Sequence, residues 1–258
     1  MDWREKMQKK PDLLIGIHSV ASALQQVPVQ VLRLYVSKQC QNRRVFELVD
    51  TARTRGIPVE MLERDEIDKK CDHERSQDIL AEFNPANIYT EKDLPALLAG
   101  IEGQPLLLVL DGIQDPHNLG ACLRTASAAG VNAVILPKDR SAGITPVVRR
   151  AAAGAGEIIP LVFVTNLART LKLLKKEGIW LFGTHDQAET SIFDASLTGP
   201  MALVMGSEGS GMRRLTAENC DFQYQIPMTG SIASLNVSVA TGVCLFEICR
   251  QRGTKLDI

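Results

Sequence analysis

The segment LDGIQDPHNLGACLRTASAAG, residues 110–130, decides how the carboxyl-terminal half of this 258-residue chain is interpreted. It opens inside the apolar run LLLVLDGI (106–113), continues through a polar stretch and returns to helical apolar spacing over 118–129. A related order of strand, polar loop and helix recurs in LVMGSEGSGMRR (203–214) and IPMTGSIASLNVSVAT (226–241). Because open α/β sheets bind small ligands at the carboxyl ends of their strands, these three loops predict a ligand site.

Strands and helices alternate through the rest of this half, which predicts a parallel sheet with helices on both faces. The first strand-to-helix turn reads DGIQDPHNLG and lacks the GxGxxG pattern, so a dinucleotide site is not indicated. Further strands are predicted at 131–136, 159–164, 179–184, 202–206 and 223–228, with helices at 145–153, 167–177 and from Asn236 onward.

The first part of the chain predicts a separate small α/β domain over residues 12–84. Helical spacing covers 16–26 and 43–55, and strand-like runs cover 29–36 and 57–61. The stretch 85–105 follows, with a short helix expected at 91–99, and the second domain is assigned to 106–256. Proline and glycine at Pro85, Pro95, Gly100, Gly103 and Pro105 are typical of a linker.

Taken in order, the three loop segments resemble motifs 1, 2 and 3 of the SpoU (TrmH-type) RNA ribose-2′-O-methyltransferases, a branch of the SPOUT methyltransferases. The resemblance implies that the carboxyl-terminal segment is threaded into a deep trefoil knot, which no pattern argument would predict. It also implies that residues 12–84 form an L30e/L7Ae-like RNA substrate-binding domain. Relatives often read HQG before the linker, whereas this chain has SQD at 76–78.

The resemblance implies S-adenosylmethionine as cofactor and a defined set of site residues. Arg124 would orient the nucleotide and stabilise negative charge on the ribose 2′-oxygen. Because arginine stays protonated at neutral pH, the proton of the 2′-hydroxyl would pass to phosphate or water. His117 is a chemically attractive base, but the family requires none there. The implied catalytic residues are Asn118, Arg124, Glu208, Ser234 and Asn236, and the implied cofactor-binding residues are Gly206, Ile226, Gly230, Ser231 and Leu235.

Simpler interpretations of the same residues remain open at this point. Asn118 is placed to cap a helix, with Arg124 as a surface residue, and Asn236 is placed to cap the last helix. The glycines of 206–211 would also suit an ordinary turn. The joint occurrence of three motifs in order favours the functional interpretation.

Net charge gives little indication of nucleic-acid binding. The formal charge of −1 and the pI near 6.4 do not suggest a strong nonspecific nucleic-acid binder. Two local basic groups are either solvated faces or contacts for phosphates. The first contains Arg33, Lys38, Arg43, Arg44, Arg53 and Arg55, and the second contains Lys138, Arg140, Arg149 and Arg150.

Cysteine usage and hydropathy predict a cytoplasmic protein without a membrane span or a metal. The first twelve residues lack the apolar core of a signal peptide, and no apolar run approaches about 18 residues. The cysteines form no CxxC pair and no zinc-like spacing with histidine, so reduced, mostly buried thiols are expected. They are Cys40, Cys71, Cys122, Cys220, Cys244 and Cys249.

The last helix, 236–250, is apolar on more than one face, which predicts a homodimer joined through the carboxyl-terminal domain. In the SPOUT family such a contact lies beside the cofactor loops, so sites could share residues. The alternative is that other helices of the same chain cover this surface. The expected activity is 2′-O-methylation of a guanosine in bacterial 23S rRNA, with tRNA methylation or a catalytically silent RNA-binding or ribosome-assembly role as alternatives.

Overall fold

The computed structural model describes residues 11–26, 30–71, 76–83, 88–232 and 234–253. The chain forms two compact units. The amino-terminal unit contains Met1–Asn87 and Ile144–Ile158, and the carboxyl-terminal unit contains Ile88–Gly143 and Ile159–Ile258. These ranges differ from the predicted domains, because most of the expected linker joins the second unit and the 144–158 segment joins the first. The functional assignment of the predicted ranges stays a prediction.

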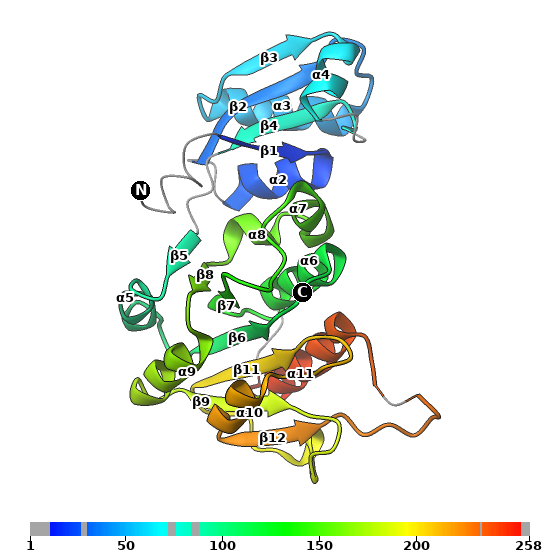
Figure 1. Ribbon diagram of the computed structural model, residues 1–258. Helices are drawn as coiled ribbons and strands as arrows, with labels where there is room; N and C mark the ends of the chain where they lie inside the picture. Colours follow the sequence, from blue (N-terminus) through cyan, green and yellow to red (C-terminus); the bar gives the residue numbers. More distant parts are fainter. Residues whose placement is uncertain (1–10, 27–29, 72–75, 84–87, 233, 254–258) are drawn as a thin grey trace. The chain divides into compact units, whose positions relative to one another are not determined.

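The amino-terminal unit is built on a four-stranded sheet with the order β1-β4-β2-β3 (Figure 1). Its strands are β1 (Asp12–Ile15), β2 (Val31–Ser37), β3 (Val59–Leu62) and β4 (Ile79–Phe83). The β2–β3 pair is parallel, and β4 pairs antiparallel with both β1 and β2. β1 and β4 were not predicted from the sequence, although β4 is central to the sheet.

Alternate residues of this sheet face two separate apolar clusters, as the twofold period of a strand requires. Leu34 and Val36 pack with α2 (Ile17–Gln26) and α3 (Arg43–Thr54). Tyr35 and Leu80 lie in the second cluster with Ile67 of α4 (Arg64–Lys70). The small α/β layer predicted for this region is therefore present.

The helices α7 (Pro146–Ala152) and α8 (Ala155–Ile158) complete the amino-terminal unit. Their segment contains a buried ion pair, with Arg149 Nη1 2.5 Å from Glu157 Oε1. Arg149 is 5% exposed and Glu157 is 1% exposed. The expectation that Arg149 belongs to a surface basic group is therefore wrong, because folding brings it against a carboxylate eight residues later.

Folding also neutralises part of the first basic group. Arg33 Nη1 lies 2.8 Å from Glu60 Oε2, and Arg43 Nε lies 3.2 Å from Glu47 Oε1. Among the residues that the structure describes, no ion pair involves Arg44, Arg53 or Arg55, which are exposed in and just after α3. The candidate phosphate contacts in this group therefore reduce mainly to these three arginines.

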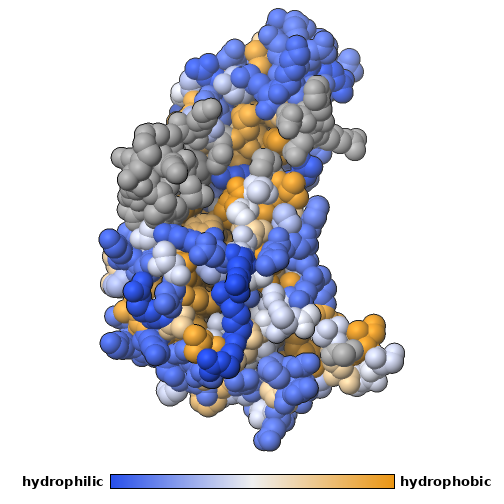
Figure 2. Space-filling model, in the orientation of Figure 1, coloured by the Kyte–Doolittle hydropathy of each residue, from blue (hydrophilic) through white to orange (hydrophobic). Residues whose placement is uncertain are grey.

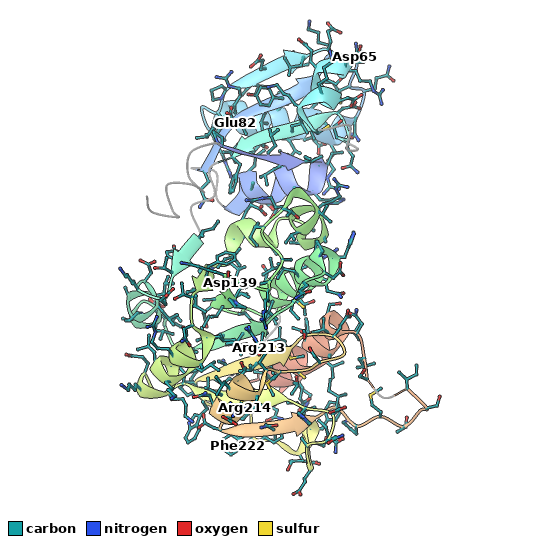
Figure 3. The ribbon with its side chains drawn as sticks, viewed as in Figure 1. Asp65, Glu82, Asp139, Arg213, Arg214 and Phe222 are labelled. Carbon is teal, nitrogen blue, oxygen red and sulfur yellow. The ribbon has the colours of Figure 1, made fainter. Side chains whose placement is uncertain are left out.

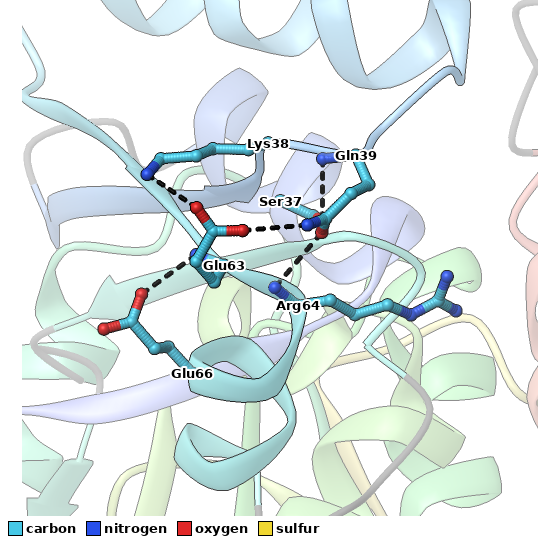
Figure 4. Close-up of polar contacts among 6 residues, drawn as sticks. All are labelled: Ser37, Lys38, Gln39, Glu63, Arg64 and Glu66. Atoms are coloured by element: carbon cyan, nitrogen blue, oxygen red, sulfur yellow. Dashed lines mark hydrogen bonds and ion pairs between the residues drawn. The ribbon is translucent and has the colours of Figure 1, made fainter.

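Lys38 belongs to a polar network at the start of α4 (Figure 4). Its Nζ atom lies 2.8 Å from Glu63 Oε1, and Gln39 Nε2 donates to Glu63 Oε2 at 2.8 Å. The backbone nitrogen of Glu63 in turn donates to Glu66 Oε2 at 2.9 Å, as in a capping box. This arrangement fixes the loop after β3 and pairs the Lys38 ammonium group with a carboxylate.

The carboxyl-terminal unit contains an eight-stranded, wholly parallel sheet with the order β10-β12-β9-β11-β6-β7-β8-β5. This confirms the predicted parallel α/β architecture. The strands are β5 (Ile88–Thr90), β6 (Leu106–Asp111), β7 (Ala133–Pro137), β8 (Leu161–Val164), β9 (Trp180–Thr184), β10 (Thr190–Ser191), β11 (Met201–Gly206) and β12 (Phe222–Gln225).

Helices cover both faces of this sheet (Figure 1). One face packs against α5 (Leu94–Ala99), α9 (Leu167–Lys176) and α10 (Arg214–Asn219), whose apolar residues share one buried cluster with the strands. The other face holds α6 (Pro116–Ala128) and α11 (Val237–Gln251), which pack against each other. A short 3-10 helix, η2 (Ile192–Asp194), contacts α11. Within the described residues, no helix is long and apolar enough to cross a membrane.

The register of β6 and β11 positions the predicted loops. The two strands are neighbours, and Gly206 at the end of β11 lies opposite Asp111 at the end of β6. From β6 the chain adds β7 and then β8 on one side of that strand in the sheet. It then returns to the other side of β6, where β11, β9 and β12 lie. This reversal is a topological switch point, where ligands bind in open α/β sheets. The implied trefoil knot stays a prediction.

Candidate active site

A buried carboxylate joins the ends of β6 and β11. Asp111 is 1% exposed and accepts hydrogen bonds from Arg213 through the backbone nitrogen at 2.8 Å and Nε at 2.6 Å. Its carboxylate also forms an ion pair with Arg213 Nη2. Arg213 directly precedes α10 (Figure 3), so this contact fixes the end of the second motif to the first. The sequence interpretation missed both residues, although an aspartate that ends an apolar strand was a usable signal.

The first motif loop ends at Asp115, which caps α6 by accepting from the backbone nitrogens of His117 and Asn118. The alternative that Asn118 is the capping residue is therefore wrong. Proline at position 116 was the missed signal, because proline favours the first turn and Asp115 directly precedes it. Since Asp115 supplies the cap, the Asn118 side chain is available for a contact with another loop.

Asn236 brings the three motifs together. Its Nδ2 atom donates to Asn118 Oδ1 at 3.0 Å and to Glu208 Oε1 at 2.5 Å. Its Oδ1 atom accepts from the backbone nitrogen and the hydroxyl of Ser238, at 3.0 and 2.6 Å. Asn236 therefore caps α11, as the simpler interpretation expected, and also links the other two motif loops.

The second motif folds into a tight loop that requires glycine. Ser207 and Gly211 exchange two backbone hydrogen bonds of 3.0 Å. A side chain at Gly206 would collide with the backbone of Gly211 and Met212. Gly209 and Gly211 have φ values of +78° and +65°, which favour glycine. Gly206 is thus a requirement of loop closure.

A cleft of about 620 Å³ lies between the second and third motif loops. Six of the sequence-predicted residues line it, in company with apolar side chains such as Met205 and Met212. The six are Gly206, Glu208, Ile226, Ser234, Leu235 and Asn236. Three residues of the predicted cofactor set and three of the predicted catalytic set therefore meet at one cavity, although their roles stay proposals.

The loop after β9 forms a further wall of the cleft that was not predicted. Thr184, His185 and Asp186 all line the cavity. The His185 backbone nitrogen donates to Tyr224 O at 3.0 Å, and its Nδ1 atom accepts from the Gln187 nitrogen at 3.1 Å. β9 lies between β11 and β12, so its polar carboxyl end could have been found by the rule that identified the other loops.

Three predicted site residues lie outside both the hydrogen-bonded junction at Asn236 and the lining of the cleft. Arg124 is exposed on α6 and is absent from the cleft lining. Gly230 and Ser231 are exposed and likewise absent from the lining, whereas Ser234 is exposed and lines it. The third motif loop carries the exposed apolar residues Met228 and Ile232, and Figure 2 shows hydrophobic atoms on its projecting end.

The thiols in this unit are not suited to nucleophilic chemistry. Burial raises the pKa of Cys122 to about 11 and the pKa values of Cys220 and Cys244 to about 12. A thiol with such a pKa is protonated at neutral pH, and the thiolate is the reactive form. All six cysteines are present as thiols and five of them are buried, as expected.

Two family models match the chain. Residues 105–246 match the SpoU rRNA Methylase family, and residues 13–89 match the model for RNA 2′-O ribose methyltransferase substrate binding. The first match spans the three motif loops and the cleft, and the second spans the small sheet of the amino-terminal unit.

Curated proteins match over nearly their whole length. A Photorhabdus laumondii protein named 23S rRNA (guanosine-2′-O-)-methyltransferase RlmB is 50% identical, covering 94% of this chain and 99% of its own. The Pseudomonas putida protein of the same name is 52% identical, with coverages of 94% and 97%. Among solved structures, the SpoU methyltransferase AviRb from Streptomyces viridochromogenes, in complex with AdoMet, has a TM-score of 0.79 at 23% identity over 98% of this chain and 95% of its own. That structural likeness supports the fold.

Proposed function

The chain belongs to the SpoU rRNA methylase family, and from this premise we propose that it methylates the ribose 2′-oxygen of a guanosine in 23S rRNA, using S-adenosylmethionine. The observation that carries the proposal is the junction of Asn118, Glu208 and Asn236 beside one cleft. The names of relatives about half identical to this chain support the choice of substrate. An rRNA substrate favours the cytoplasm as the working compartment.

The cleft fits the proposed cofactor in size and chemistry. Its volume of about 620 Å³ is that of an ordinary small-molecule pocket. Ile226 and Leu235 offer apolar surface, and Glu208 offers a carboxylate that favours a cationic ligand. Gly230 and Ser231 would contribute backbone groups from the third motif loop. S-adenosylmethionine supplies an electrophilic methyl group when it is bound.

The other site residues would prepare the ribose hydroxyl. Arg124 would hold the nucleotide through its guanidinium fork and stabilise negative charge as it develops on the 2′-oxygen. Because arginine cannot accept a proton at neutral pH, the 2′-hydroxyl proton passes to phosphate or water. Ser234 would contact the nucleotide at the open side of the cleft, while Asn118 and Asn236 hold the loops in register.

A second copy of the chain would complete the site. Val239, Val243 and Phe246 repeat at helical spacing on α11, and the first and last are 52% and 43% exposed. Arg124 is exposed on α6, which packs beside α11. An isologous contact through this face would cover the apolar residues and present Arg124 to the partner's cleft. The homodimer proposal therefore explains why Arg124 is absent from the lining of its own cleft.

RNA selection is assigned to the amino-terminal domain, residues 12–84. Arg44, Arg53 and Arg55 offer exposed charges there for phosphates. The competing functions are the same methylation on tRNA and a silent role in RNA binding or ribosome assembly. The set of Asn118, Glu208 and Asn236 at the cleft argues against a silent protein.

The purified full chain, incubated with S-adenosylmethionine and separate samples of unmodified 23S rRNA and tRNA, tests the proposal. Mapping of 2′-O-methyl groups should find one modified guanosine in the 23S rRNA and none in the tRNA. Modification confined to tRNA would replace the substrate, and binding of 23S rRNA without any methyl transfer would favour the silent role.

A further inference from the structure

The loop after β7 is held against the first motif. The backbone nitrogen of Ala142 donates to Ile113 O at 2.8 Å, and Ser141 Oγ donates to the same oxygen at 3.4 Å. At its start, Lys138 N donates to Val164 O at 2.9 Å. The loop is thus fixed to the sheet at one end and to the segment after β6 at the other.

Arg140, within this loop, has an unusual backbone conformation. Its φ value is +58°, in the left-handed region that arginine rarely adopts. Gly112, with φ +86°, lies next to it: a Cβ at Gly112 would be 3.5 Å from Arg140 O, an ordinary van der Waals distance. A residue other than glycine keeps such a conformation only when its surroundings impose it, and such residues are common at functional sites.

The side chain of Arg140 is a free cation near the site. It is exposed, and among the described residues no ion pair or side-chain hydrogen bond involves it. Arg213, in contrast, is occupied by Asp111. Gly112 follows Asp111, which lies opposite Gly206 of the cleft on a strand about 4.8 Å away. Arg140 therefore stands at the same carboxyl edge of the sheet as the methylation site, beside its first motif.

We propose that Arg140 binds a phosphate of the RNA strand next to the nucleotide that is methylated. This inference rests on the proposed function and adds a substrate contact outside the three motifs. A guanidinium can hold a phosphate with two parallel hydrogen bonds, and the loop's attachment to Ile113 keeps it in register with the first motif. Arg140 is a positioning residue that acts on the flanking backbone, so it is expected to affect RNA affinity more than the chemical step.

Two substitutions separate the charge from the backbone conformation. Arg140→Asn and Arg140→Gly both remove the cation, and both residues tolerate the left-handed region. Lys172→Asn, on the exposed side of α9, removes one positive charge elsewhere in the same unit. Arg140→Lys keeps the charge but loses the planar fork, so it should restore only part of the binding.

Each full-length variant is tested for binding to a 23S rRNA transcript over about 50–200 mM KCl, and for methyl transfer. We expect both Arg140 variants to weaken binding and raise the KM for RNA about three- to tenfold, with a salt slope smaller by about 0.7–0.9. Turnover at saturating RNA, S-adenosylmethionine affinity and melting temperature should stay near the values of the unmodified chain.

Equal salt slopes for Arg140→Asn, Lys172→Asn and the unmodified chain would overturn the proposal. A lower melting temperature together with a lower S-adenosylmethionine affinity in both Arg140 variants would also overturn it. Arg140 would then stabilise the fold and not contact RNA. Failure of the proposed function has a separate signature: an unmodified chain that binds the transcript with the Arg140-dependent slope but transfers no methyl group.

Discussion

Asn236 Nδ2 lies 2.5 Å from Glu208 Oε1, although 28 residues separate the two in the chain. The same nitrogen donates to Asn118, and the oxygen of the same amide caps α11. One side chain therefore couples the start of the last helix to the second motif loop. A change at Asn236 should affect loop geometry and helix capping separately, depending on which amide atom is lost.

Asn236→Asp should abolish most methyl transfer while leaving the fold intact. Aspartate is as good a helix cap as asparagine, but it cannot donate to Asn118 and it repels Glu208. A loss of about 1–3 kcal/mol of loop stabilisation would lower kcat/KM roughly 5- to 150-fold. Activity measured beside thermal unfolding checks this, with Asn236→Ala as the variant that should also lose about 0.5–2 kcal/mol of stability. An Asp variant with unchanged activity would remove the coupling role.

Gly206→Ala and Gly230→Ala should differ sharply, although both glycines were predicted to bind the cofactor. An added carbon at Gly206 meets the backbone of the loop, whereas nothing lies within 4 Å of one at Gly230. The first variant should lose S-adenosylmethionine binding, and the second should keep it near normal if Gly230 contributes backbone groups only. Calorimetric titration of both variants decides this, and equal affinities would show that the second motif loop can open without loss of the site.

The strands of the larger sheet were predictable from sequence because both of their faces are buried. β6 is buried at all six positions and β11 at five, which gives continuous apolar runs. Once the strands were predicted, the shared location of the three motif loops was predictable too, because the carboxyl ends of parallel strands lie at one edge of the sheet. The small sheet was harder: β4, ILAEF, is short and follows SQD at 76–78, and its antiparallel partners are distant in sequence.

Pairings between distant residues escaped the sequence interpretation. Arg33 was counted in a basic group, but Glu60 and Glu82 reach it from β3 and β4. The Asp111–Arg213 pair joins residues 102 positions apart. Charge counted within a local window cannot show such partners. Arg149 was misplaced for a simpler reason, because Glu157 lies eight residues later, just beyond the counted group of 138–150.

Arg149→Met should destabilise the amino-terminal unit without changing the salt dependence of RNA binding. The substitution leaves the Glu157 carboxylate without its arginine partner at a site 1% exposed to solvent. Breaking a buried pair in this way costs about 3–5 kcal/mol, whereas replacing both partners by apolar residues is often neutral. Denaturant unfolding of Arg149→Met and of the double variant with Glu157→Met tests the pair. A stable single variant with a smaller salt slope would return Arg149 to the surface group.

Arg124→Ala should abolish methyl transfer and leave S-adenosylmethionine affinity near normal, because its proposed partner is the RNA. The loss of one stabilising donor corresponds to about 2.7–4 kcal/mol, or roughly 100- to 1,000-fold in kcat. Arg124→Lys should not restore full activity, since a point charge lacks the planar fork. Single-turnover rates with 23S rRNA measure the effect, and near-normal turnover by the Ala variant would exclude Arg124 from the mechanism.

Phe246→Asp should convert a homodimer into a monomer. Light scattering of the unmodified chain at micromolar concentration should give a molar mass of twice 28.2 kDa. The reason is that the apolar face of α11 is left exposed in a monomer. Leu215→Asp is the matched control, since Leu215 is 52% exposed on α10, on the opposite face of the sheet. It should leave the dimer intact. A monomeric unmodified chain that methylates RNA would contradict both the dimer and the shared site.

Mixing two inactive variants tests whether Arg124 acts in the partner's cleft. In a hybrid of Arg124→Ala and Glu208→Ala subunits, one cleft would contain both defects and the other neither, provided that Arg124 crosses the interface. Random exchange in an equal mixture makes about half of the dimers hybrids, and one of the two clefts in each hybrid is intact. The mixture should then regain about a quarter of the normal activity. If Arg124 serves the cleft of its own chain, every site in the mixture carries one defect and no activity returns. The recovered fraction therefore distinguishes a shared site from two independent ones, even where the dimer itself is already established by light scattering.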